Sequence, residues 1–243
     1  MVEEEKREEE APLEMPEPES VAEEVEPRVK APEDWVPKTE IGRMVLSGEI
    51  KNIDEIFKMG KKIREPEIVD ALLPNLKAEL VLIGGTPGKG GGIRRTPTRR
   101  TARMHRSGRR FKISAFVVVG DENGHIGMGK GVSNDHATAI EKATKVAKLN
   151  IIPIVRGCGS WECRCGEPHS IPMRVSGKAG SVRVTLIPAP RGLGLCCSEE
   201  VKKILKLAGI KDVWSKSFGE TRTRMNVALA TFDALKKLNA MKR

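Results

Sequence analysis

Residues 109–131 constrain the fold more than any other part of this chain. Apolar side chains alternate along the first half, where one face of an extended strand carries Phe111, Ile113, Ala115, Val117 and Val119. The sequence DENG follows at residues 121–124, and Asn-Gly is favoured in two-residue hairpin turns. Residues 125–131 then return as a second strand. The pattern predicts a β-hairpin around which the rest of the chain is organised.

The returning strand carries almost no side chains on one face. Gly127, Gly129 and Gly131 lie there, and a bare face lets another backbone come unusually close. The next helix is predicted to end at about Leu149, and its small-residue face consists of Ala137, Ile140, Ala143 and Ala147. Either this helix or RNA could cover the glycines. The apolar first strand favours a hairpin that is largely core, with RNA contacts at its flanks.

Charge is divided unevenly along the chain. The formal net charge is +10, yet residues 1–34 hold 14 Asp or Glu and only 4 Lys or Arg. We expect this acidic tail to be disordered, either shielding the basic body from other polyanions or acting as a solubilising extension. The remaining residues hold 39 basic and 19 acidic side chains. Such an excess, concentrated in arms and loops, indicates a nucleic acid as the partner.

Composition disfavours two other kinds of partner. No run of about 18 apolar residues is present and the N-terminus is acidic, so we expect a cytoplasmic protein with no membrane partner. The chain has five Phe, three Trp and no Tyr, which is few for a protein that stacks single-stranded bases on aromatic rings. Contacts to phosphates, sugars and RNA shape are therefore expected.

Residues 88–112 contain no acidic side chain. Gly and Pro interrupt this basic stretch, so it is predicted to be an extended arm that becomes ordered on its partner. Closely spaced cations repel one another, whereas each can release a counterion from a phosphate. A solvated basic loop is the alternative. The candidate RNA-binding residues here are Lys89, Arg94, Arg95, Arg99, Arg100, Arg103, Arg106, Arg109, Arg110 and Lys112.

The segment before this arm predicts short elements. Order is expected to begin near Trp35, with one helix following Asn52 and a second helix opening at Pro66. Residues 79–83 are predicted to form a strand that stops at a pair of glycines.

The second half of the chain predicts another set of strands and helices. Strands at residues 171–175 and 182–186 are expected to be joined by a turn at residues 176–180. Ser198 caps a helix with two Glu in its first turn, as the helix dipole favours, and Gly209 ends it. A strand near residues 210–217 precedes the last helix. The expected apolar face of that helix is Met225, Ala228, Leu229, Phe232 and Leu235.

Five cations outside the arm are further candidates for RNA contact: Lys130, Lys178, Arg191, Arg222 and Arg224. The last two begin the final helix, where each opposes the helix dipole at a cost of about 0.3–1 kcal/mol. A phosphate at this helix end would offset that cost. Two solvated arginines on a surface turn are the alternative.

A Cys/His segment follows the first set of strands. Its candidate metal ligands are Cys158, Cys163, Cys165 and His169. Three thiols and one imidazole form a closed ligand set for structural zinc, so we expect one zinc ion and no organic cofactor. The spacing departs from the common C-x2-C form, and a metal-free loop or a disulfide is the alternative. Cys196 and Cys197 are interpreted as small buried residues.

Motifs for enzymatic chemistry are incomplete. The sequence GGTPGKG at residues 84–90 resembles a phosphate-binding loop, but Ile83 stands where that motif requires its first Gly. Gly90 also follows the lysine in place of Ser or Thr. No motif links a histidine to a nucleophile. A free regulatory RNA-binding protein and an RNA-modifying enzyme are the alternatives to a structural RNA-binding protein.

Several short motifs, taken in order, resemble the small-subunit ribosomal protein five family. They are RRF at 109–111, VVVGD at 117–121, NGHIGMG at 123–129, ATAI at 137–140, PHSIP at 168–172, SVRV at 181–184, IPAPRG at 187–192 and ATFDA at 230–234. The resemblance covers about residues 35–240. Residues 35–37 and 157–170 are similar to the archaeal and eukaryotic branch, and the acidic tail and cysteines favour an archaeal source.

Alternating helices and strands predict an α+β protein in two domains, and the resemblance implies their architecture. The first would be a double-stranded-RNA-binding-like α-β-β-β-α domain, and the second a β-β-α-β-α domain with a left-handed crossover. The predicted segments are an acidic tail at 1–34, an N-terminal extension with the first helix at 35–87, the basic arm at 88–110, the first domain at 111–156, the Cys/His loop at 157–169 and the C-terminal ribosomal domain at 170–243.

The same resemblance implies a structural constituent of the small ribosomal subunit. Its partners would be small-subunit rRNA, the neighbouring proteins two, three, four and eight, and the path by which mRNA enters. In this family the protein stabilises the body–head region near the decoding site and supports translational accuracy and mRNA unwinding. Members of the wider family often lack the three cysteines while keeping the histidine position.

Overall fold

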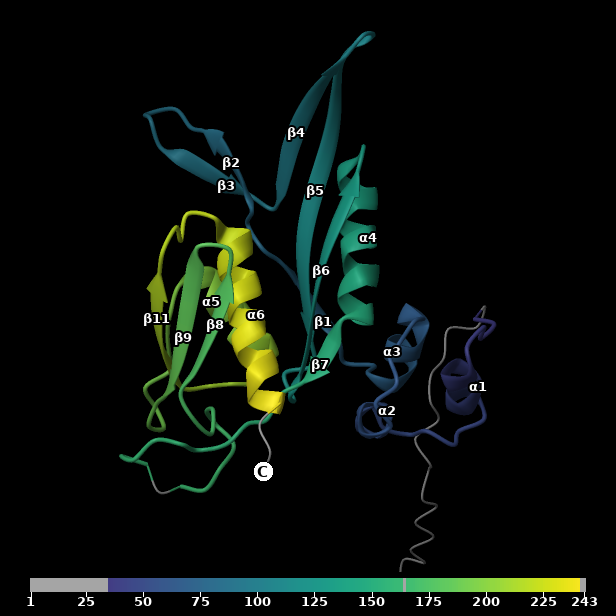
Figure 1. Ribbon diagram of the computed structural model, residues 1–243, viewed down its shortest axis with the longest axis vertical. Coiled ribbons are helices and arrows are strands. Elements are labelled where there is room, and N and C mark those ends of the chain that lie inside the picture. The colour runs from purple at the N-terminus through teal and green to yellow at the C-terminus, as the bar shows by residue number, and fades with distance from the viewer. Residues whose placement is uncertain (1–34, 164, 241–243) are drawn as a thin grey trace, which may run out of the picture.

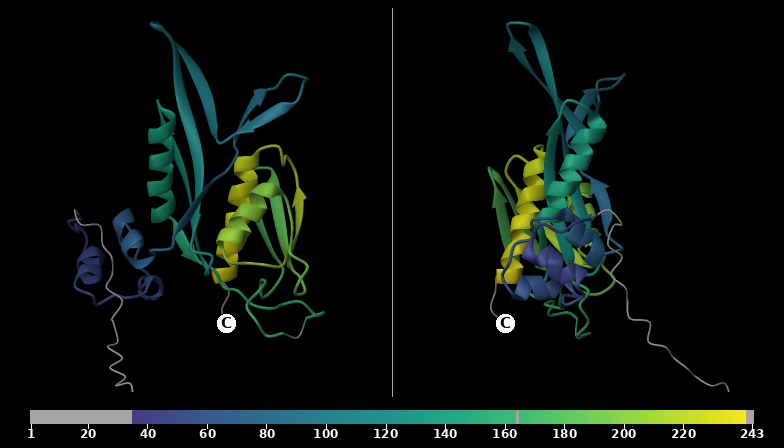
Figure 2. Two further views of the ribbon diagram at one scale, coloured as in Figure 1. Left: turned by 180° about the vertical axis from the view of Figure 1, so that it is seen from behind. Right: turned by 90° about the vertical axis from the view of Figure 1, so that its right-hand side faces the viewer.

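The computed structural model describes residues 35–163 and 165–240. The predicted acidic tail at residues 1–34 lies outside them. Three short helices, α1 (Glu40–Leu46), α2 (Ile53–Lys58) and α3 (Pro66–Leu72), form a cluster on one side of the molecule. A long sheet with one helix lies at the centre, and a second sheet with two helices lies beyond it (Figure 1 and Figure 2).

The central sheet is antiparallel and has the strand order β1-β5-β6-β7, with β4 pairing with the first half of β5. Its strands are β1 (Lys77–Leu80), β4 (Thr98–His105), β5 (Gly108–Gly120), β6 (His125–Ser133) and β7 (Ile151–Pro153). β5 and β6 form the predicted hairpin. Together with α3, β1 and the following helix α4 (His136–Leu149), they give the predicted α-β-β-β-α order. The strand expected at residues 79–83 begins two residues earlier and ends at Leu80.

Helix α4 covers the glycine face of β6. A Cβ built on Gly129 would overlap the helix backbone at Ala143 and Ala147, and Gly127 and Gly131 approach the same helix as closely. The occupant of the glycine face is therefore a helix and not RNA. The buried alanines of α4 are Ala139, Ala143 and Ala147. The expected face was wrong at Ala137, which is exposed because it lies two positions before Ala139 and therefore on the opposite side of the helix.

The strands of the hairpin separate two hydrophobic cores. Val117 and Val119 belong to the core that β5 shares with α4 and the three N-terminal helices. Phe116, Val118 and Ile126 belong to the core that the hairpin shares with the helices of the second sheet. Each such side chain contributes about 1.5–3 kcal/mol when fully buried. The lower part of the hairpin is thus core on both faces, as its apolar alternation predicted.

The second sheet has the order β10-β11-β9-β8. Its elements are β8 (Val175–Ala179), β9 (Val182–Pro188), β10 (Leu195–Cys196), α5 (Glu199–Leu207), β11 (Val213–Phe218) and α6 (Arg224–Ala240). They follow the predicted β-β-α-β-α order, with β10 as an additional short strand parallel to β11. Gly209, at φ +75°, lies just after α5, where the sequence predicted the helix to end.

Residues 176–179 belong to β8, so the turn predicted for this segment was wrong. Gly177 explains the difference, because its missing side chain lets β8 lie against the backbone of α6 at Ala230 and Ala234. The chain reverses only around Gly180, which has a φ of 58°.

Three side chains of the second half lie where we did not expect them. Met173 precedes β8 and is 48% exposed, and Leu229 on α6 is 39% exposed. Leu229 is displaced because α6 buries Val227, Ala228 and Ala230 against the sheet. Cys196 is exposed, whereas Cys197 packs against the core.

The basic arm is folded into β-structure, which corrects the prediction of an irregular extended segment. Strands β2 (Gly84–Pro87) and β3 (Ile93–Thr96) pair as one antiparallel hairpin. Strand β4 and the first half of β5 form a second hairpin that extends beyond α4 (Figure 1). Pairing satisfies the backbone N–H and C=O groups, while Gly90 and Gly91, both with positive φ, form the first reversal.

The N-terminal helices are attached to the β5–β6 turn through His125. Its Nδ1 lies 2.6 Å from Asp121 Oδ2, and its Nε2 lies 3.1 Å from Asp54 Oδ1 on α2. The ring also stacks on Phe57. Burial opposes the charged ring, but hydrogen bonds to Asp121 and then to Asp54 outweigh it and raise the pKa of His125. The protonated imidazole therefore joins two carboxylates from separate parts of the chain.

We predict that the attachment of α2 weakens as the pH rises. The folded-state pKa of His125 exceeds the unfolded value of about 6.5. Its contribution to stability is therefore complete below that pH and is lost as the pH rises through the folded-state pKa. Because Asp54 is largely exposed, the effect should be below about 1 kcal/mol. Hydrogen exchange of the α2 amides, corrected for intrinsic rates, should show less protection at about pH 8 than at about pH 6.

The substitution His125→Gln should abolish this dependence. Lys148→Met, which breaks the ion pair between α4 and Asp70 of α3, should leave it intact. The same pH dependence in the His125→Gln protein would refute the assignment.

The contact between β6 and α4 predicts a large stability loss for Gly129→Ala. The added Cβ would overlap backbone atoms of α4, which cannot move aside as the end of a flexible side chain could. We expect the free energy of unfolding in urea to fall by at least about 2 kcal/mol. Gly92→Ala is the matched control, because a Cβ there meets open space, and it should change stability by less than about 0.5 kcal/mol. Equal urea midpoints for the two variants would contradict the packing argument.

Candidate RNA interface and Cys/His cluster

The β4–β5 hairpin beyond α4 has one strongly basic face. Directly paired residues of antiparallel strands lie on the same side, and the pairs include Arg103 with Arg110 and Thr101 with Lys112. The cations of this face are Arg99, Arg103, Arg110 and Lys112, and all four are exposed. The regular alternation of the strands therefore gathers onto one surface charges that are scattered in the sequence.

The opposite face of this hairpin carries an arginine stack. The Arg100 guanidinium lies 3.5 Å from the centroid of the Phe111 ring, and that of Arg109 lies 5.5 Å from it. Exposed cation–π contacts of this kind contribute about 0.5–1 kcal/mol. They fix the direction of the guanidinium groups without neutralising them. Met104 is 80% exposed near the tip of the hairpin.

The ten candidate cations of the basic arm are all exposed. Residues 80–120 contain no Asp or Glu, and within the described part of the chain none of the ten forms an ion pair. Their charge is therefore fully available to an anionic partner. The two hairpins distribute it over β3, β4, β5 and the loop containing Lys89.

The five other candidate cations differ in their surroundings. Lys130 and Lys178 are exposed on β6 and β8. Arg191 pairs with Glu167 at 3.0 Å, beside the Cys/His loop. The Arg222 side chain is 91% exposed, and its only acidic contact in the described chain is Glu220 at 3.7 Å.

Arg224 is held within the protein. Its Nη1 lies 2.6 Å from Oε1 of Glu200, whose side chain is only 4% exposed. Oε2 of Glu200 accepts a weak hydrogen bond from the N–H of Leu82 and lies near Lys203. The sequence interpretation of Glu200 as a helix-dipole partner was incomplete, because this carboxylate connects α5, α6 and the chain after β1. An RNA contact by Arg224 remains a prediction, and it would have to compete with Glu200.

The four predicted metal ligands converge. The three sulfurs and one ring nitrogen of Cys158, Cys163, Cys165 and His169 all lie within 4.8 Å of one another. Cys163 Sγ is 3.2 Å from Cys165 Sγ and 3.7 Å from His169 Nε2. All three cysteines are free thiols, so the disulfide alternative is not the arrangement of this structure.

His169 is oriented by a carboxylate that the sequence analysis missed. Its Nδ1 lies 2.8 Å from Asp212 Oδ2, and both residues are buried. Asp212 is fixed in turn, because its Oδ1 accepts from the N–H of Gly194 and its carbonyl accepts from the Ser170 hydroxyl. A separation of 43 residues hides this pair from any local motif. The contact leaves His169 Nε2 directed at the sulfurs, as in carboxylate–histidine–zinc groups.

Two of the thiols differ in acidity. Hydrogen bonds from the Arg191 backbone and then from Cys165 lower the pKa of Cys163 to about 6. The hydrogen bond with Cys163 raises the pKa of Cys165 to about 11. At neutral pH the pair therefore holds one thiolate and one thiol. Because thiolates are the metal-binding form, a bound cation would displace the remaining proton.

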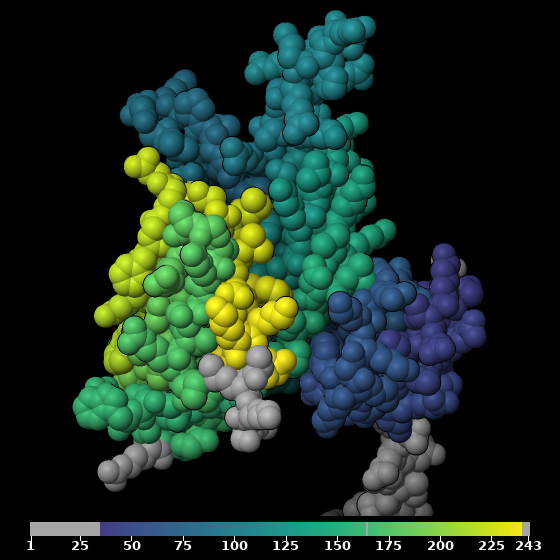
Figure 3. Space-filling view, viewed as in Figure 1, coloured from purple at the N-terminus to yellow at the C-terminus, as the bar shows by residue number. Residues whose placement is uncertain are grey.

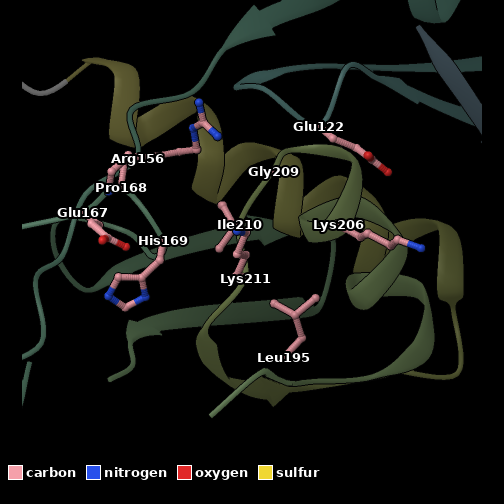
Figure 4. Close-up of a pocket in the computed structure, with 10 residues that line it drawn as sticks. All are labelled: Glu122, Arg156, Glu167, Pro168, His169, Leu195, Lys206, Gly209, Ile210 and Lys211. Carbon is pink, nitrogen blue, oxygen red and sulfur yellow. The ribbon is translucent and has the colours of Figure 1, made fainter. Parts of the chain in front are cut away.

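Cys163, His169 and Asp212 also lie in the order of a catalytic triad. A pocket of about 670 Å³ adjoins His169, but no cysteine lines it (Figure 4). Its carboxylates are already paired, Glu122 with Lys77 and Glu167 with Arg191. With two other sulfurs beside Cys163 in place of a substrate cavity, the geometry favours a ligand cluster over a nucleophile.

Comparison with known proteins gives consistent matches. Residues 97–155 match the family described as Ribosomal protein S5, N-terminal domain, and residues 177–243 match Ribosomal protein S5, C-terminal domain. Among archaeal relatives, the chain is 53% identical over 207 residues to small ribosomal subunit protein uS5 of Nanoarchaeum equitans, covering 85% of this chain and 89% of that protein. It is 52% identical to uS5 of Thermofilum pendens, covering 84% and 94%. For uS5 of Methanocaldococcus jannaschii the identity is 51%, covering 85% and 88%.

In the described residues, every helix is too short or too polar to cross a lipid bilayer.

Proposed function

The chain belongs to the ribosomal protein S5 family, and on this premise we propose that it is a structural constituent of the small ribosomal subunit. It binds rRNA and neighbouring ribosomal proteins and is not an enzyme. The two exposed basic hairpins, whose segment of the chain lacks any acidic residue, are the observation that supports this function most directly.

The hairpins bind RNA mainly through phosphates. Guanidinium groups suit bidentate phosphate contacts, and eight of the ten arm cations are arginines. Phe111 is the single aromatic ring of this arm apart from His105, and it already stacks with arginines. The buried lower half of β5 holds these unpaired charges in place before RNA arrives. Binding by this mechanism is strongly salt-dependent and tolerant of RNA sequence.

The finer placement is also part of the proposal. The family resemblance favours a position near the entrance of the mRNA path and the decoding site, with a role in translational accuracy. It favours small-subunit proteins two, three, four and eight as neighbours. The RNA-contacting set comprises the ten arm cations together with Lys130, Lys178, Arg191 and Arg222. Arg224 is a further predicted member that would have to leave Glu200 to contact RNA.

Co-sedimentation tests this proposal. The full chain should migrate with small subunits on sucrose gradients at high salt. Replacing Arg103, Arg106 and Arg110 by Gln should reduce incorporation. It should also lower the slope of log affinity for rRNA against log salt by about 2–3, because three phosphate contacts are lost. The control removes the same charge from three exposed lysines of the N-terminal extension, Lys51, Lys58 and Lys62. A wild-type protein that stays at the top of the gradient would indicate a free RNA-binding factor instead.

We further infer that Cys158, Cys163, Cys165 and His169 hold one structural zinc ion. Tetrahedral ligands at the usual zinc–sulfur distance of about 2.3 Å are about 3.8 Å apart. The ligand atoms here are within 4.8 Å of one another, so small side-chain movements suffice. Asp212 contacts Nδ1 of His169 and so keeps Nε2 directed at the sulfurs, the arrangement that carboxylates give to zinc-binding histidines. The ion would join the three cysteines within a loop whose other attachments include the bridge of Gly157 to Ser170 and the Glu167–Arg191 ion pair.

Metal analysis tests the zinc proposal. Full-length protein purified with zinc and then desalted should retain about one ion per chain. Cys163→Ser should lose it, whereas Cys196→Ser, which removes an exposed thiol outside the cluster, should keep it. Asp212→Asn should weaken zinc affinity about 10–100-fold. Zinc content that is negligible in the wild type, or unaffected by Cys163→Ser, would refute the site.

A further inference from the structure

The structure contains a groove of about 890 Å³ between the two halves of the protein. The β2–β3 hairpin forms one wall, strands β4, β5 and β6 form the floor, and the segment entering α6 forms the other wall. Figure 3 shows the notch that separates the β2–β3 hairpin from the β4–β5 hairpin. The groove is distinct from the outer tip of the β4–β5 hairpin, where Arg103, Arg106 and Arg110 lie.

The lining of the groove is cationic and rich in hydroxyl groups. Its exposed cations come from four separate elements, and none of the lining residues is acidic. They are Arg95, Arg99, Arg100, Lys130 and Arg222. Arg224 also borders the groove, but Glu200 engages it. A cavity with this lining attracts an anion and repels a cationic or purely apolar ligand.

The hydroxyl groups indicate what else the ligand must offer. The Thr101 and Ser114 hydroxyls donate to the carbonyls of Lys112 and Arg99, so their oxygens keep lone pairs that can accept from a ligand. A ribose 2′-hydroxyl is such a donor, whereas the carboxylates of an acidic peptide only accept. No Phe, Trp or Tyr lines the groove, and its one ring, that of His136, is hydrogen-bonded to Thr98, so the groove has no platform on which successive bases could stack. The chemistry fits a ribose–phosphate backbone.

The size of the groove favours one strand over a duplex. Its volume lies within the range of about 300–1,000 Å³ that is typical of pockets for small ligands. A duplex is too wide to enter such a space, and it can contact only the outer surfaces of the hairpins. A few nucleotides of a single strand can lie along the floor.

We propose that this groove holds a single RNA strand by its ribose–phosphate backbone, with both halves of the protein contacting the same strand. The inference rests on the proposed rRNA binding and adds a specific site to it. Arg99 and Lys130 contact the strand from the central sheet, and Arg222 contacts it from the second half. The Arg224–Glu200 pair keeps the start of α6 in position for that contact.

The test uses the full chain and an oligouridylate of about ten nucleotides that carries one 4-thiouridine. Replacing Arg99, Lys130 and Arg222 by Gln should weaken binding on the order of tenfold and lower the salt slope by about 2. The control with Lys51, Lys58 and Lys62 replaced by Gln removes the same charge and should change affinity less than about threefold. Photocrosslinks should map both to residues 98–101 or 114 and to residues 222–225.

Two competitors decide the chemistry of the ligand. The deoxy strand should bind more weakly, and polyglutamate should displace RNA poorly. The proposal would be overturned if the deoxy strand bound as tightly as the RNA strand, or if polyglutamate displaced RNA as effectively as RNA itself. It would also be overturned if the two triple variants lost equal affinity, or if crosslinks came from only one half of the protein. If any of these results is obtained while the wild type still enters small subunits, only the proposed groove site is refuted. If the wild type does not enter subunits, the proposed function fails as well.

Discussion

Close backbone contact between β6 and α4 is the constraint on which the rest of the structure depends. Three glycines leave the middle of one face of β6 without side chains, and the backbone of α4 packs there at its buried alanines. This contact closes one core and leaves the other face of the same hairpin for the second core. Since β5 contributes side chains to both cores, the two halves of the protein have a fixed relation to each other, and a groove between them can act as one site.

Strand β5 is buried along its second half and exposes charged side chains along its first half. β5 runs from Gly108 to Gly120, and it changes from exposed to buried at Ile113. Before that point β5 carries Arg109, Arg110 and Lys112. The ten cations of the whole arm have no acid within residues 80–120, so their mutual repulsion opposes an ordered arrangement. Burial of the lower half on two faces, together with the β4–β5 pairing, offsets that repulsion. Stability in the core thus permits a preorganised basic surface, which lowers the ordering cost of RNA binding.

Local sequence patterns predicted the parts of this fold that depend on residues close together in the sequence. Alternation and the Asn-Gly turn predicted β5 and β6, and spacing predicted that the four zinc-ligand candidates would meet. The β2–β3 and β4–β5 hairpins were missed because Gly, Pro and Arg interrupt the alternation of apolar and polar residues by which strands are recognised. These strands are held instead by hydrogen bonds between their backbones. Asp212 was missed because its contact with His169 spans 43 residues. The same holds for Glu200, which meets Arg224 across 24 residues.

Arginines have two roles in this protein, one in holding the fold and one proposed in binding RNA. Whether an arginine meets a buried carboxylate distinguishes these roles better than the local density of charge does. Arg224 stands beside Arg222 in the same basic motif, yet one guanidinium meets a buried carboxylate and the other is almost fully exposed. A buried pair of this kind contributes to fold geometry, because losing either partner leaves the other charge uncompensated. An exposed arginine such as Arg222, whose contact with Glu220 is itself at the surface, contributes little to the fold and gains most from a phosphate. The proposed RNA surface is therefore best defined by exposed cations without a buried acidic partner, and those of the proposed set lie mainly on the two hairpins and in the groove between them.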